Sequence, residues 1–263
     1  MNEITTITGR TLEIAWAKAY ASVTQTADCE LCPLFVTISE PEFSDPEGTN
    51  LVRIRLDETL SASGKATTTT VANTLFPWSL WNPKREHTCV YDRYRKHVLP
   101  SIKRDNPKGT YFQRIIDYCP EGLTEPVNQL EQIIETWKDH HNHRHSALQI
   151  SIFDPTRDHV HNQRLGFPCL HQICFTPHGE NGCEGLSVTA FYATQHIWTK
   201  GYGNYLGLIR LGRFVANVLG LRLLRVSCMA GKAVVGIGHS KDTRNELREL
   251  CINTASQHDT SPS

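Results

Sequence analysis

One short segment of the chain combines a thiol and an imidazole at a spacing that could do covalent chemistry. In L-G-F-P-C-L-H-Q-I-C-F, residues 165–175, Cys169 follows Pro168 directly and His171 stands two residues further on. A cysteine thiolate is a strong nucleophile, and a histidine within reach can take its proton, so the pair suits nucleophilic catalysis. The same segment has the pattern of an apolar strand, in which a cysteine more often fills the core. Side chains alternate across a strand, so Cys169 and His171 are expected on one face and Cys174 on the other.

Two further groups of residues have the composition of metal sites. Cys29 and Cys32 form a C-x-x-C, and H-H-N-H-R-H occupies residues 140–145. A zinc site would need a second pair of ligands at matching spacing, and Cys89 and Cys119 stand alone. The histidine cluster lies between a predicted helix and a predicted strand, where a solvated loop is the simpler interpretation. We therefore expect no metal, and the nine cysteines predict free thiols rather than a disulfide framework.

The composition is that of an ordinary globular protein. The chain has 263 residues, with 27 Lys and Arg against 27 Asp and Glu, and 39% of its residues are apolar. This balanced charge gives no general attraction to nucleic acid or to a membrane surface, so neither partner is expected. The longest apolar run, near residues 215–224, is too short and too interrupted to span a bilayer. The first ten residues lack the basic and apolar regions of a signal peptide, which favours a cytoplasmic protein.

The elements that must position these residues are a mixture of helices and strands. Apolar spacing predicts helices at 11–21, 91–102, 127–138 and 202–219, the last of them buried. Alternation and short apolar runs predict strands at 33–39, 51–56, 147–153, 165–175, 185–194 and 221–230. Helices and strands do not alternate strictly, so an α+β fold is expected rather than a doubly wound one. We expect a single domain over residues 1–253 and a disordered polar tail at 254–263.

Five short motifs follow one another between residues 109 and 219. They are Y-F-Q-R-I-I-D-Y from Tyr111, F-D-P at 153–155, P-C at 168–169, L-S-V-T-A-F-Y ending at Tyr192, and G-Y-G-N ending at Asn204. Their types and order resemble those of the thymidylate synthases and the related deoxycytidylate hydroxymethylases, which place P-C at the head of a strand. The resemblance implies a thymidylate-synthase-like mixed sheet packed with helices, with one buried central helix. Residues 1–108 are the divergent part of this domain.

The resemblance also implies a reaction and the residues that perform it. In that family a cysteine thiolate adds to C6 of a pyrimidine nucleotide. C5 then attacks a one-carbon unit carried by 5,10-methylenetetrahydrofolate, and the family's enzymes work as homodimers. The catalytic positions correspond here to Cys169, His171, Tyr111 and Asn73. The substrate-binding positions correspond to, or lie near, Asn204, Tyr192, Asp154, Arg144 and Arg164.

Some residues depart from the family's pattern. Leu170 stands where the family has a histidine, and His171 is at most a partial substitute. Asn73, in A-N-T-L-F-P, takes the place of a glutamate that transfers protons, and an asparagine cannot cycle a proton. The family's phosphate-binding arginines are replaced by Y-A-T-Q at 192–195 and by Ser146 and Ala147. The arginines that could replace them, or that are merely surface charges, are Arg157, Arg164, Arg210 and Arg213.

Three functions remain open after these comparisons of motifs. The first is a methyl- or hydroxymethyltransferase of the thymidylate synthase type, and it requires positive charge that lowers the pKa of Cys169. The second is a nucleotide-binding or scaffold module that keeps the fold without the reaction. The third is an enzyme that uses the same cysteine addition on a different pyrimidine-like substrate. The retained P-C and G-Y-G-N favour the first, whereas the lost acid and arginines favour the other two.

Overall fold

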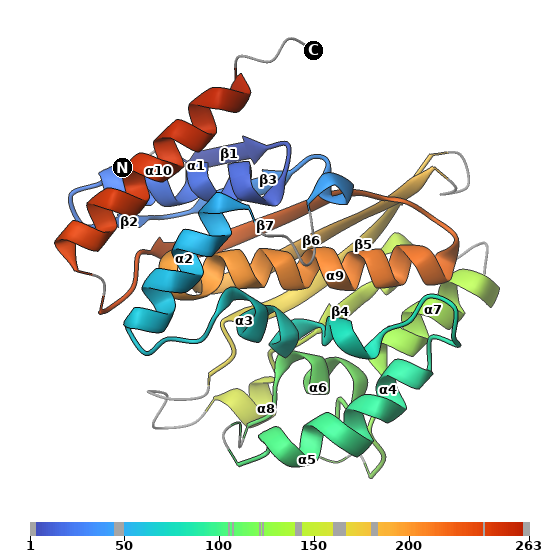
Figure 1. Cartoon of the computed structure of the whole chain (residues 1–263). Coiled ribbons are helices and arrows are strands. Elements are labelled where there is room, and N and C mark those ends of the chain that lie inside the picture. The colour runs from blue at the N-terminus through green and yellow to red at the C-terminus, as the bar shows by residue number, and fades with distance from the viewer. Residues whose placement is uncertain are drawn as a thin grey trace.

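One mixed β-sheet organises the molecule. The computed structural model describes residues 4–44, 50–104, 106, 108–120, 122, 124–139, 144–159, 167–179, 184–238 and 240–259. In this part of the chain seven strands join in the order β1-β3-β7-β6-β5-β4, with β2 beside the end of β7 (Figure 1). The β1–β3 and β6–β7 pairs are parallel, and the other pairs are antiparallel. The strands are β1 (Thr5–Gly9), β2 (Glu30–Leu31), β3 (Leu34–Ile38), β4 (Gln149–Ser151), β5 (Leu170–His178), β6 (Gly185–His196) and β7 (Leu223–Val234).

Helices make up the rest of the described architecture, which confirms the predicted α+β class. They are α1 (Leu12–Gln25), α2 (Leu51–Ala62), α3 (Thr68–Leu75), α4 (Cys89–Arg93), α5 (Leu99–Ile102), α6 (Tyr111–Ile116), α7 (Gln129–Asp139), α8 (Pro155–Asp158), α9 (Tyr202–Leu219) and α10 (Lys241–Asp259). Two π-helical turns, η3 (Tyr94–Val98) and η6 (Ile197–Gly201), lead into α5 and α9. The 3-10 turns are η1 (Pro41–Phe43), η2 (Trp78–Leu80) and η4 (His145–Ala147). None of the helices in the described ranges combines the length and the apolar character needed to cross a membrane.

The core lies between one face of the sheet and the helices α1 and α9. Helix α9 is buried along most of its length, as its apolar sequence predicts (Figure 1). Two of its glycines allow close packing on opposite sides. A Cβ at Gly207 would lie 3.0 Å from the carbonyl oxygen of Ala72 in α3, and one at Gly212 would lie 2.9 Å from Cγ2 of Val188 in β6. Any larger side chain at either position would push α9 away from its neighbour.

The opposite face of the sheet carries no helix in the described structure. Its side chains form rows across the strands, because paired residues in adjacent strands point to the same side. One row runs through Phe35, Met229 and Phe191, which are half-buried, to the exposed Gln172. This outer face is therefore a mixed apolar and polar surface on the side of the sheet away from α9.

Residues 51–56 are helical, so the strand predicted there is wrong. They begin α2, and the side chain of Asn50 caps this helix by accepting a hydrogen bond from Arg53 N at 2.9 Å. Val52, Leu56 and Leu60 recur every four residues and are the buried apolar side chains of the helix. Six residues with alternating polarity fit both the two-residue period of a strand and the 3.6-residue period of a helix. The buried apolar stripe that continues to Leu60 fits only the helix.

The C-terminal segment is more ordered than its polarity predicts. Helix α10 packs against α1 and α2, with Leu247 and Cys251 buried, and it continues to Asp259. Once a packed turn exists, each further residue adds a hydrogen bond at little cost, so the helix propagates into the polar segment. The expectation of disorder is therefore wrong for residues 254–259, and residues 260–263 lie outside the described residues.

Candidate active site

Cys169 lies at the entrance to β5, directly before the first residue of the strand. Its backbone carbonyl accepts a hydrogen bond from the amide of Ala193 at 2.9 Å, which ties it to β6. The side chain is half-buried against the core, whereas Pro168 before it is buried. The thiol thus stands at the edge of the apolar core, where a reagent can reach it.

Two tyrosines predicted for the site lie beside this thiol. The phenol of Tyr111, the first residue of α6, hydrogen-bonds to the backbone of Leu170 and Cys169. Burial raises the pKa of Tyr111 to about 12. Tyr192 is paired with Leu170 in the register of β5 and β6 and is fully buried. Burial raises the pKa of Tyr192 well above its usual value, and its hydroxyl has no hydrogen-bond partner among the described residues. Both phenols keep their protons at neutral pH, and the hydroxyl of Tyr192 can still donate.

A lysine that the sequence reasoning missed also acts on the thiol. Lys200 belongs to η6, the turn between β6 and α9, and its ammonium lowers the pKa of Cys169. The sequence signal was its place in I-W-T-K-G-Y-G-N, where it is the one charged residue before a predicted buried helix. Tyr111, Tyr192 and Lys200 thus form, with Cys169, a group that we name the Cys169 cluster.

The net effect of these surroundings keeps Cys169 protonated. Burial raises the pKa of the thiol, and the opposing effect of Lys200 is smaller. The expectation that nearby positive charge or hydrogen-bond donors lower the pKa of this thiol is therefore wrong, because burial decides the direction. A thiolate forms here only when something else offsets the cost of burying its charge.

His171 lies in a different environment from the thiol. The register of β5 against β6 shifts between Leu170 and Gln172, a bulge that breaks the alternation on which a shared face with Cys169 was predicted. The imidazole stacks on Phe153, with ring centroids 4.8 Å apart, and it hydrogen-bonds to the carbonyl of Pro168. Burial lowers the pKa of His171, and Asp158 opposes that effect. These contacts favour a structural role over that of a base for Cys169.

Asp154 closes the F-D-P segment as the N-cap of α8. Its Oδ1 accepts hydrogen bonds from the amide and the hydroxyl of Thr156 at 2.9 and 2.7 Å. Its other carboxylate oxygen is buried and has no hydrogen-bond partner in the described part of the chain. Behind it, Arg114 forms a bidentate ion pair with Asp158 at 2.7 and 2.9 Å. This pair holds the segment that underlies Pro168 and Cys169, because Asp158 also accepts from the amide of Asp154.

The side chain of Asn73 binds an arginine. Its Oδ1 accepts a hydrogen bond from Arg210 at 3.1 Å, and Arg210 is buried under the ring of Trp78. Arg213, one turn further along α9, donates to the carbonyls of Pro41, Glu42 and Ser44. The interpretation of Arg210 and Arg213 as surface charges is therefore wrong, and both hold parts of the fold together.

Asn204 and the predicted substrate-binding arginines complete the set. Asn204 is buried and is the third residue of α9, so it is not the N-cap that a glycine before it suggested. Arg144 is exposed at the start of η4, and Arg157 is exposed in α8. Arg164 lies outside the described residues, as do the first four residues of the histidine cluster at 140–145.

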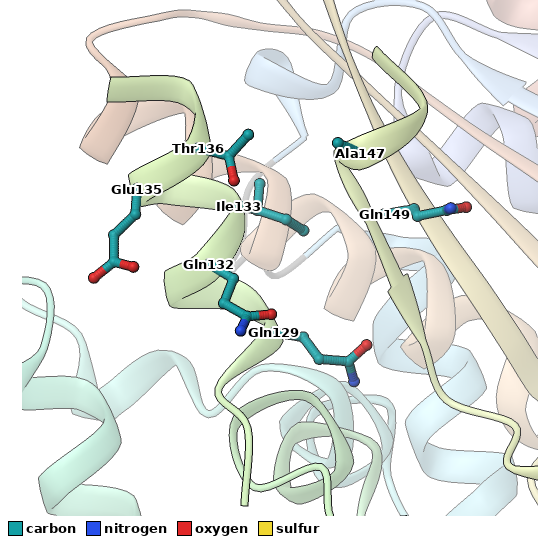
Figure 2. A pocket seen from close by; sticks show the side chains of 7 residues that line it. All are labelled: Gln129, Gln132, Ile133, Glu135, Thr136, Ala147 and Gln149. Atoms are coloured by element: carbon teal, nitrogen blue, oxygen red, sulfur yellow. The ribbon is translucent and has the colours of Figure 1, made fainter. Parts of the chain in front are cut away.

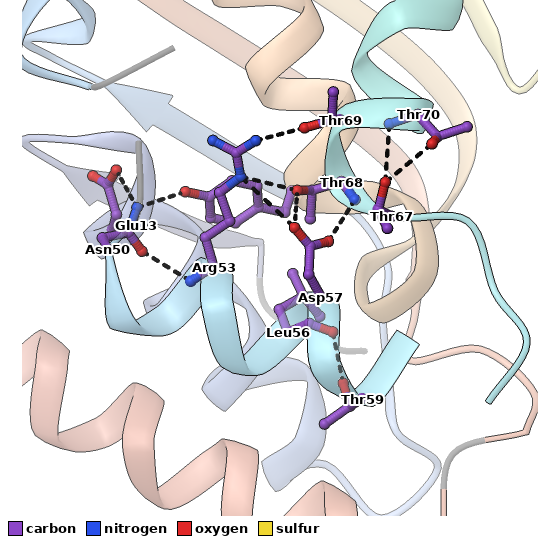
Figure 3. Close-up of polar contacts among 11 residues, drawn as sticks. Glu13, Asn50, Arg53, Leu56, Asp57, Thr59, Thr67, Thr68, Thr69 and Thr70 are labelled. Carbon is purple, nitrogen blue, oxygen red and sulfur yellow. Dashed lines mark hydrogen bonds and ion pairs between the residues drawn. The ribbon is translucent and has the colours of Figure 1, made fainter. Parts of the chain in front are cut away.

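The T-T-T-T run forms a polar network with Arg53, shown in Figure 3. Thr67 caps α3, and the guanidinium of Arg53 donates to the hydroxyls of Thr68 and Thr69 at 3.1 and 2.6 Å. Asp57 occupies the N-terminus of α3 by accepting from the amide of Thr68 at 2.6 Å. This buried arginine therefore serves the junction of α2 and α3, and its charge is matched by that of Asp57.

A separate pocket lies between α7 and the segment that leads into β4. It has a volume of about 370 Å³ and is lined mainly by amide and small side chains, among them Gln129, Gln132 and Gln149 (Figure 2). Gln129 is itself bonded to both backbone groups of Ser151, so it completes the edge of β4. None of the residues predicted for catalysis lines this pocket, and it is distinct from the Cys169 cluster.

The remaining question is what this arrangement is related to. Within the described ranges no three His, Cys, Asp or Glu side chains converge as a metal site would require. The Cys169 cluster instead offers a thiol, two phenols and an ammonium, which suit addition of sulfur to an electron-poor ring. No model of a known protein family matches the chain, and no curated protein matches it.

Proposed function

We propose that this chain is a thymidylate-synthase-like transferase that moves a one-carbon unit to C5 of a pyrimidine nucleotide through a covalent adduct of Cys169. The observation that carries the proposal is the Cys169 cluster. It combines a thiol at the head of a strand, an ammonium, and a phenol hydroxyl that has no hydrogen-bond partner among the described residues. The order of the P-C, Y and G-Y-G-N motifs supports it.

The addition step can be described in terms of these residues. The thiol loses its proton to solvent, and the sulfur forms a bond to C6 of the ring while the C5–C6 π electrons move onto C5 and the neighbouring carbonyl. That oxygen gains negative charge, and a phenol such as Tyr192 can donate a hydrogen bond to it. C5 then bonds to the incoming one-carbon unit; loss of the C5 proton to solvent supplies the electron pair that restores the C5–C6 double bond and expels the thiolate from C6. Splitting the reaction in this way replaces one difficult step with two easier ones.

The folate requirement fits the described residues poorly. 5,10-Methylenetetrahydrofolate would supply the one-carbon unit, and the family uses a glutamate and an aspartate beside it. Asn73 replaces the glutamate and is bonded to Arg210, and the aspartate position falls near His196 or Ile197. The titratable neighbours of Cys169 in the described ranges are an ammonium and two phenols. We therefore derive no step through the folate.

No carboxylate is among the titratable neighbours of Cys169 in the described ranges, and this favours a second candidate function. The chain would then use the same cysteine addition on a different pyrimidine-like substrate, or bind a nucleotide without turning it over. The bond between Asn73 and Arg210 supports this candidate, because it gives the residue at the acid's position a structural role. So does the raised pKa of Cys169, which burial causes.

A panel of 5-fluoropyrimidines tests the covalent step. Once C5 carries both the fluorine and the transferred one-carbon unit, it has no proton to lose, so the thiolate cannot be expelled and the adduct persists. Each member is therefore incubated with and without 5,10-methylenetetrahydrofolate. We expect intact mass spectrometry to show one added ligand per chain for at least one member of a panel of uracil and cytosine nucleosides and monophosphates. Cys169→Ala should abolish the adduct completely, and Cys174→Ala, the matched change on the outer face, should keep it.

Two results of this panel would contradict the proposals. If no member adds and Cys169→Ala binds the ligands as well as the wild type does, the transferase should be abandoned in favour of a binding module. If an adduct forms to the same extent without methylenetetrahydrofolate, the second candidate replaces the first.

We also propose that the chain forms a homodimer through the outer face of the sheet. The row of Phe35, Met229 and Phe191 supplies an apolar centre that no helix covers in the described structure. We expect Met229→Glu to weaken the dimer at least tenfold in sedimentation equilibrium, because it buries a carboxylate at the centre of the interface. Ile252→Glu, the same kind of change on the exposed side of α10, should leave the assembly unchanged. A wild-type monomer at high protein concentration would refute the proposal.

A further inference from the structure

The strand β4 lies at the edge of the described sheet, and α7 packs beside it. In an antiparallel pair, successive residues of a strand direct their N–H and C=O groups alternately toward and away from the partner strand. The amide of Ile152 donates to the carbonyl of His171 in β5 at 2.8 Å, and the carbonyl of Leu148 accepts from β5 at 2.9 Å. The N–H and C=O groups of Gln149 and Ser151, which alternate with these residues, therefore point away from β5 and toward α7.

At Ser151 a side-chain amide takes the place of a further strand. The carboxamide of Gln129 donates to the carbonyl of Ser151 at 2.9 Å and accepts from its amide at 2.9 Å. Its Nε2 also donates to the backbone carbonyl of Arg114 at 3.0 Å, which fixes the carboxamide in place. A primary carboxamide carries a donor and an acceptor side by side, so it satisfies both polar groups of one strand residue. The edge of β4 is therefore recognised by an amide at one of its two outward-facing positions.

The other outward-facing position, Gln149, borders the pocket between α7 and the segment that leads into β4. In the described part of the chain, neither the amide nor the carbonyl of Gln149 has a hydrogen-bond partner. Figure 2 shows the side chain of Gln149 turned away from α7, so its backbone faces the helix. The side-chain carbonyl of Gln149 accepts a hydrogen bond from Gln172, which holds the side chain in that direction. The pocket thus offers one free N–H and one free C=O next to each other.

The rest of the pocket suits a small uncharged molecule. Ile133 and Thr136 point from α7 toward the β4 segment, and Ala147 lines the opposite side (Figure 2). Among the described lining residues only Glu135 is charged, and its exposed side chain points away from β4. An anionic ligand would therefore find no cation in this lining. The volume of about 370 Å³ lies within the range of small-molecule sites.

We propose that this pocket binds a small uncharged molecule through a primary carboxamide or a lactam, which pairs with the backbone of Gln149 as Gln129 pairs with Ser151. The carbonyl of the ligand accepts from the N–H of Gln149, and the N–H of the ligand donates to the C=O of Gln149. Aromatic carboxamides and nucleobases with a lactam edge belong to this class. An added peptide strand does not fit, because it would also need the polar groups of Ser151, which Gln129 holds. The site is separate from the Cys169 cluster and does not depend on the proposed function.

Four small probes test the proposal by ligand-observed NMR titration of the full-length protein. Nicotinamide and 2-pyridone carry the required donor and acceptor, whereas N,N-dimethylnicotinamide and N-methyl-2-pyridone keep the acceptor and lack the donor. We expect nicotinamide and 2-pyridone to bind with dissociation constants of about 1–10 mM, a range consistent with their size. The methylated probes should bind about tenfold more weakly, because the carbonyl of Gln149 would be covered without a donor.

Two variants at one position isolate the backbone contact. Gln149→Ala removes the side chain and keeps the N–H, so it should bind nicotinamide within about twofold of the wild type. Gln149→Pro removes the N–H on the free side of β4, where an edge strand tolerates proline, and it should weaken binding about tenfold. Circular dichroism shows whether each variant keeps the native fold.

A second pair of variants tests the pocket from the side of α7 and decides the matter if Gln149→Pro does not fold. Thr136→Phe fills the pocket and should abolish nicotinamide binding, whereas Lys138→Phe, at an exposed position outside the pocket lining, should keep it. Cys169→Ala should also keep it, because the thiol lies in the separate cluster. The proposal is overturned if neither nicotinamide nor 2-pyridone binds, or if the methylated probes bind equally well. It is also overturned if Thr136→Phe binds nicotinamide as the wild type does, or if Cys169→Ala loses binding.

Discussion

Replacing Arg114 with methionine is expected to lower the free energy of unfolding by about 3–5 kcal/mol, because it leaves the charge of Asp158 buried without a partner. The exposed fractions of the two side chains are 5% and 1%, and two hydrogen bonds of 2.7 and 2.9 Å join them. Arg114 also donates to the carbonyl of Ile152 at 3.0 Å. Urea unfolding followed by circular dichroism gives the measurement.

A matched exposed pair provides the control for this prediction. Arg55 and Glu58 lie 2.8 Å apart on α2, with more than half of each side chain exposed. We expect Arg55→Met to change stability by no more than about 0.5 kcal/mol, because water screens such a pair. Adding Asp158→Leu to Arg114→Met should recover part of the loss, since it removes the unpaired charge. A loss below about 1 kcal/mol for Arg114→Met would contradict a buried, unscreened pair.

The ion pair of Arg114 and Asp158 makes the free energy of unfolding depend on pH in a predictable direction. Burial alone would raise the pKa of Asp158. The hydrogen bonds from Arg114 and from the Asp154 amide, together with the charges of Arg114 and Arg157, outweigh burial and lower it. A carboxyl group whose pKa is lowered by folding contributes its full stability above the unfolded value. That contribution is lost as the pH falls below about 4 and through the folded value. The difference in free energy of unfolding between the wild type and Arg114→Met should therefore become smaller as the pH falls below about 4.

Much of the fold follows from local patterns, and the failures have identifiable causes. The amphipathic spacing at 127–138 and the apolar run at 202–219 predicted α7 and α9, because both segments bury a long apolar stripe. Residues 51–56 were misassigned because six residues do not distinguish a period of 2 from one of 3.6. α10 was missed because its stability comes from packing of Leu247 and Cys251 on other helices rather than from its own polar sequence.

The candidate site was predictable in its thiol and phenols but not in its charges. Cys169, Tyr111 and Tyr192 come together as the order of the motifs predicts. His171 departs because a bulge at that residue, which no pattern signals, changes the direction of its side chain. Lys200 could not be assigned, because its position near Cys169 depends on how a π-helical turn folds back at the end of β6.

The stability of the molecule is expected to fall steeply above pH 9, and the thiol of Cys228 should be a main cause. Cys228 lies in β7 and is 4% exposed, and burial raises its pKa to about 12. A thiol whose pKa is raised by folding stabilises the protein fully below its unfolded pKa, near 9. That stability is lost as the pH rises through the interval up to the folded value. Each pH unit corresponds to about 1.4 kcal/mol, so this one group accounts for about 4 kcal/mol between pH 9 and 12.

Replacing Cys228 with alanine should flatten this part of the stability curve. At pH 8 the variant is expected to be less stable than the wild type, because the substitution leaves a small cavity. At pH 11 that deficit should shrink by about 2–3 kcal/mol or reverse, because the variant has no thiol to ionise. Cys32→Ala, at an exposed position, should leave the curve unchanged. If the free energy of unfolding changes with pH equally for the wild type and Cys228→Ala between pH 8 and 11, the prediction is contradicted.

The position of Cys228 connects this alkaline instability to the candidate site. Gln195 donates to its sulfur at 3.8 Å and accepts from the hydroxyl of Tyr205 at 2.7 Å, so the three form a buried polar chain. After burial, Cys228 is the group that most raises the pKa of Tyr192. Ionising Cys228 would therefore add a negative charge that opposes ionisation of the Tyr192 phenol. Fluoropyrimidine adduct formation should be lost with the fold above pH 9 in the wild type, and Cys228→Ala should retain it to higher pH if its folded state persists there.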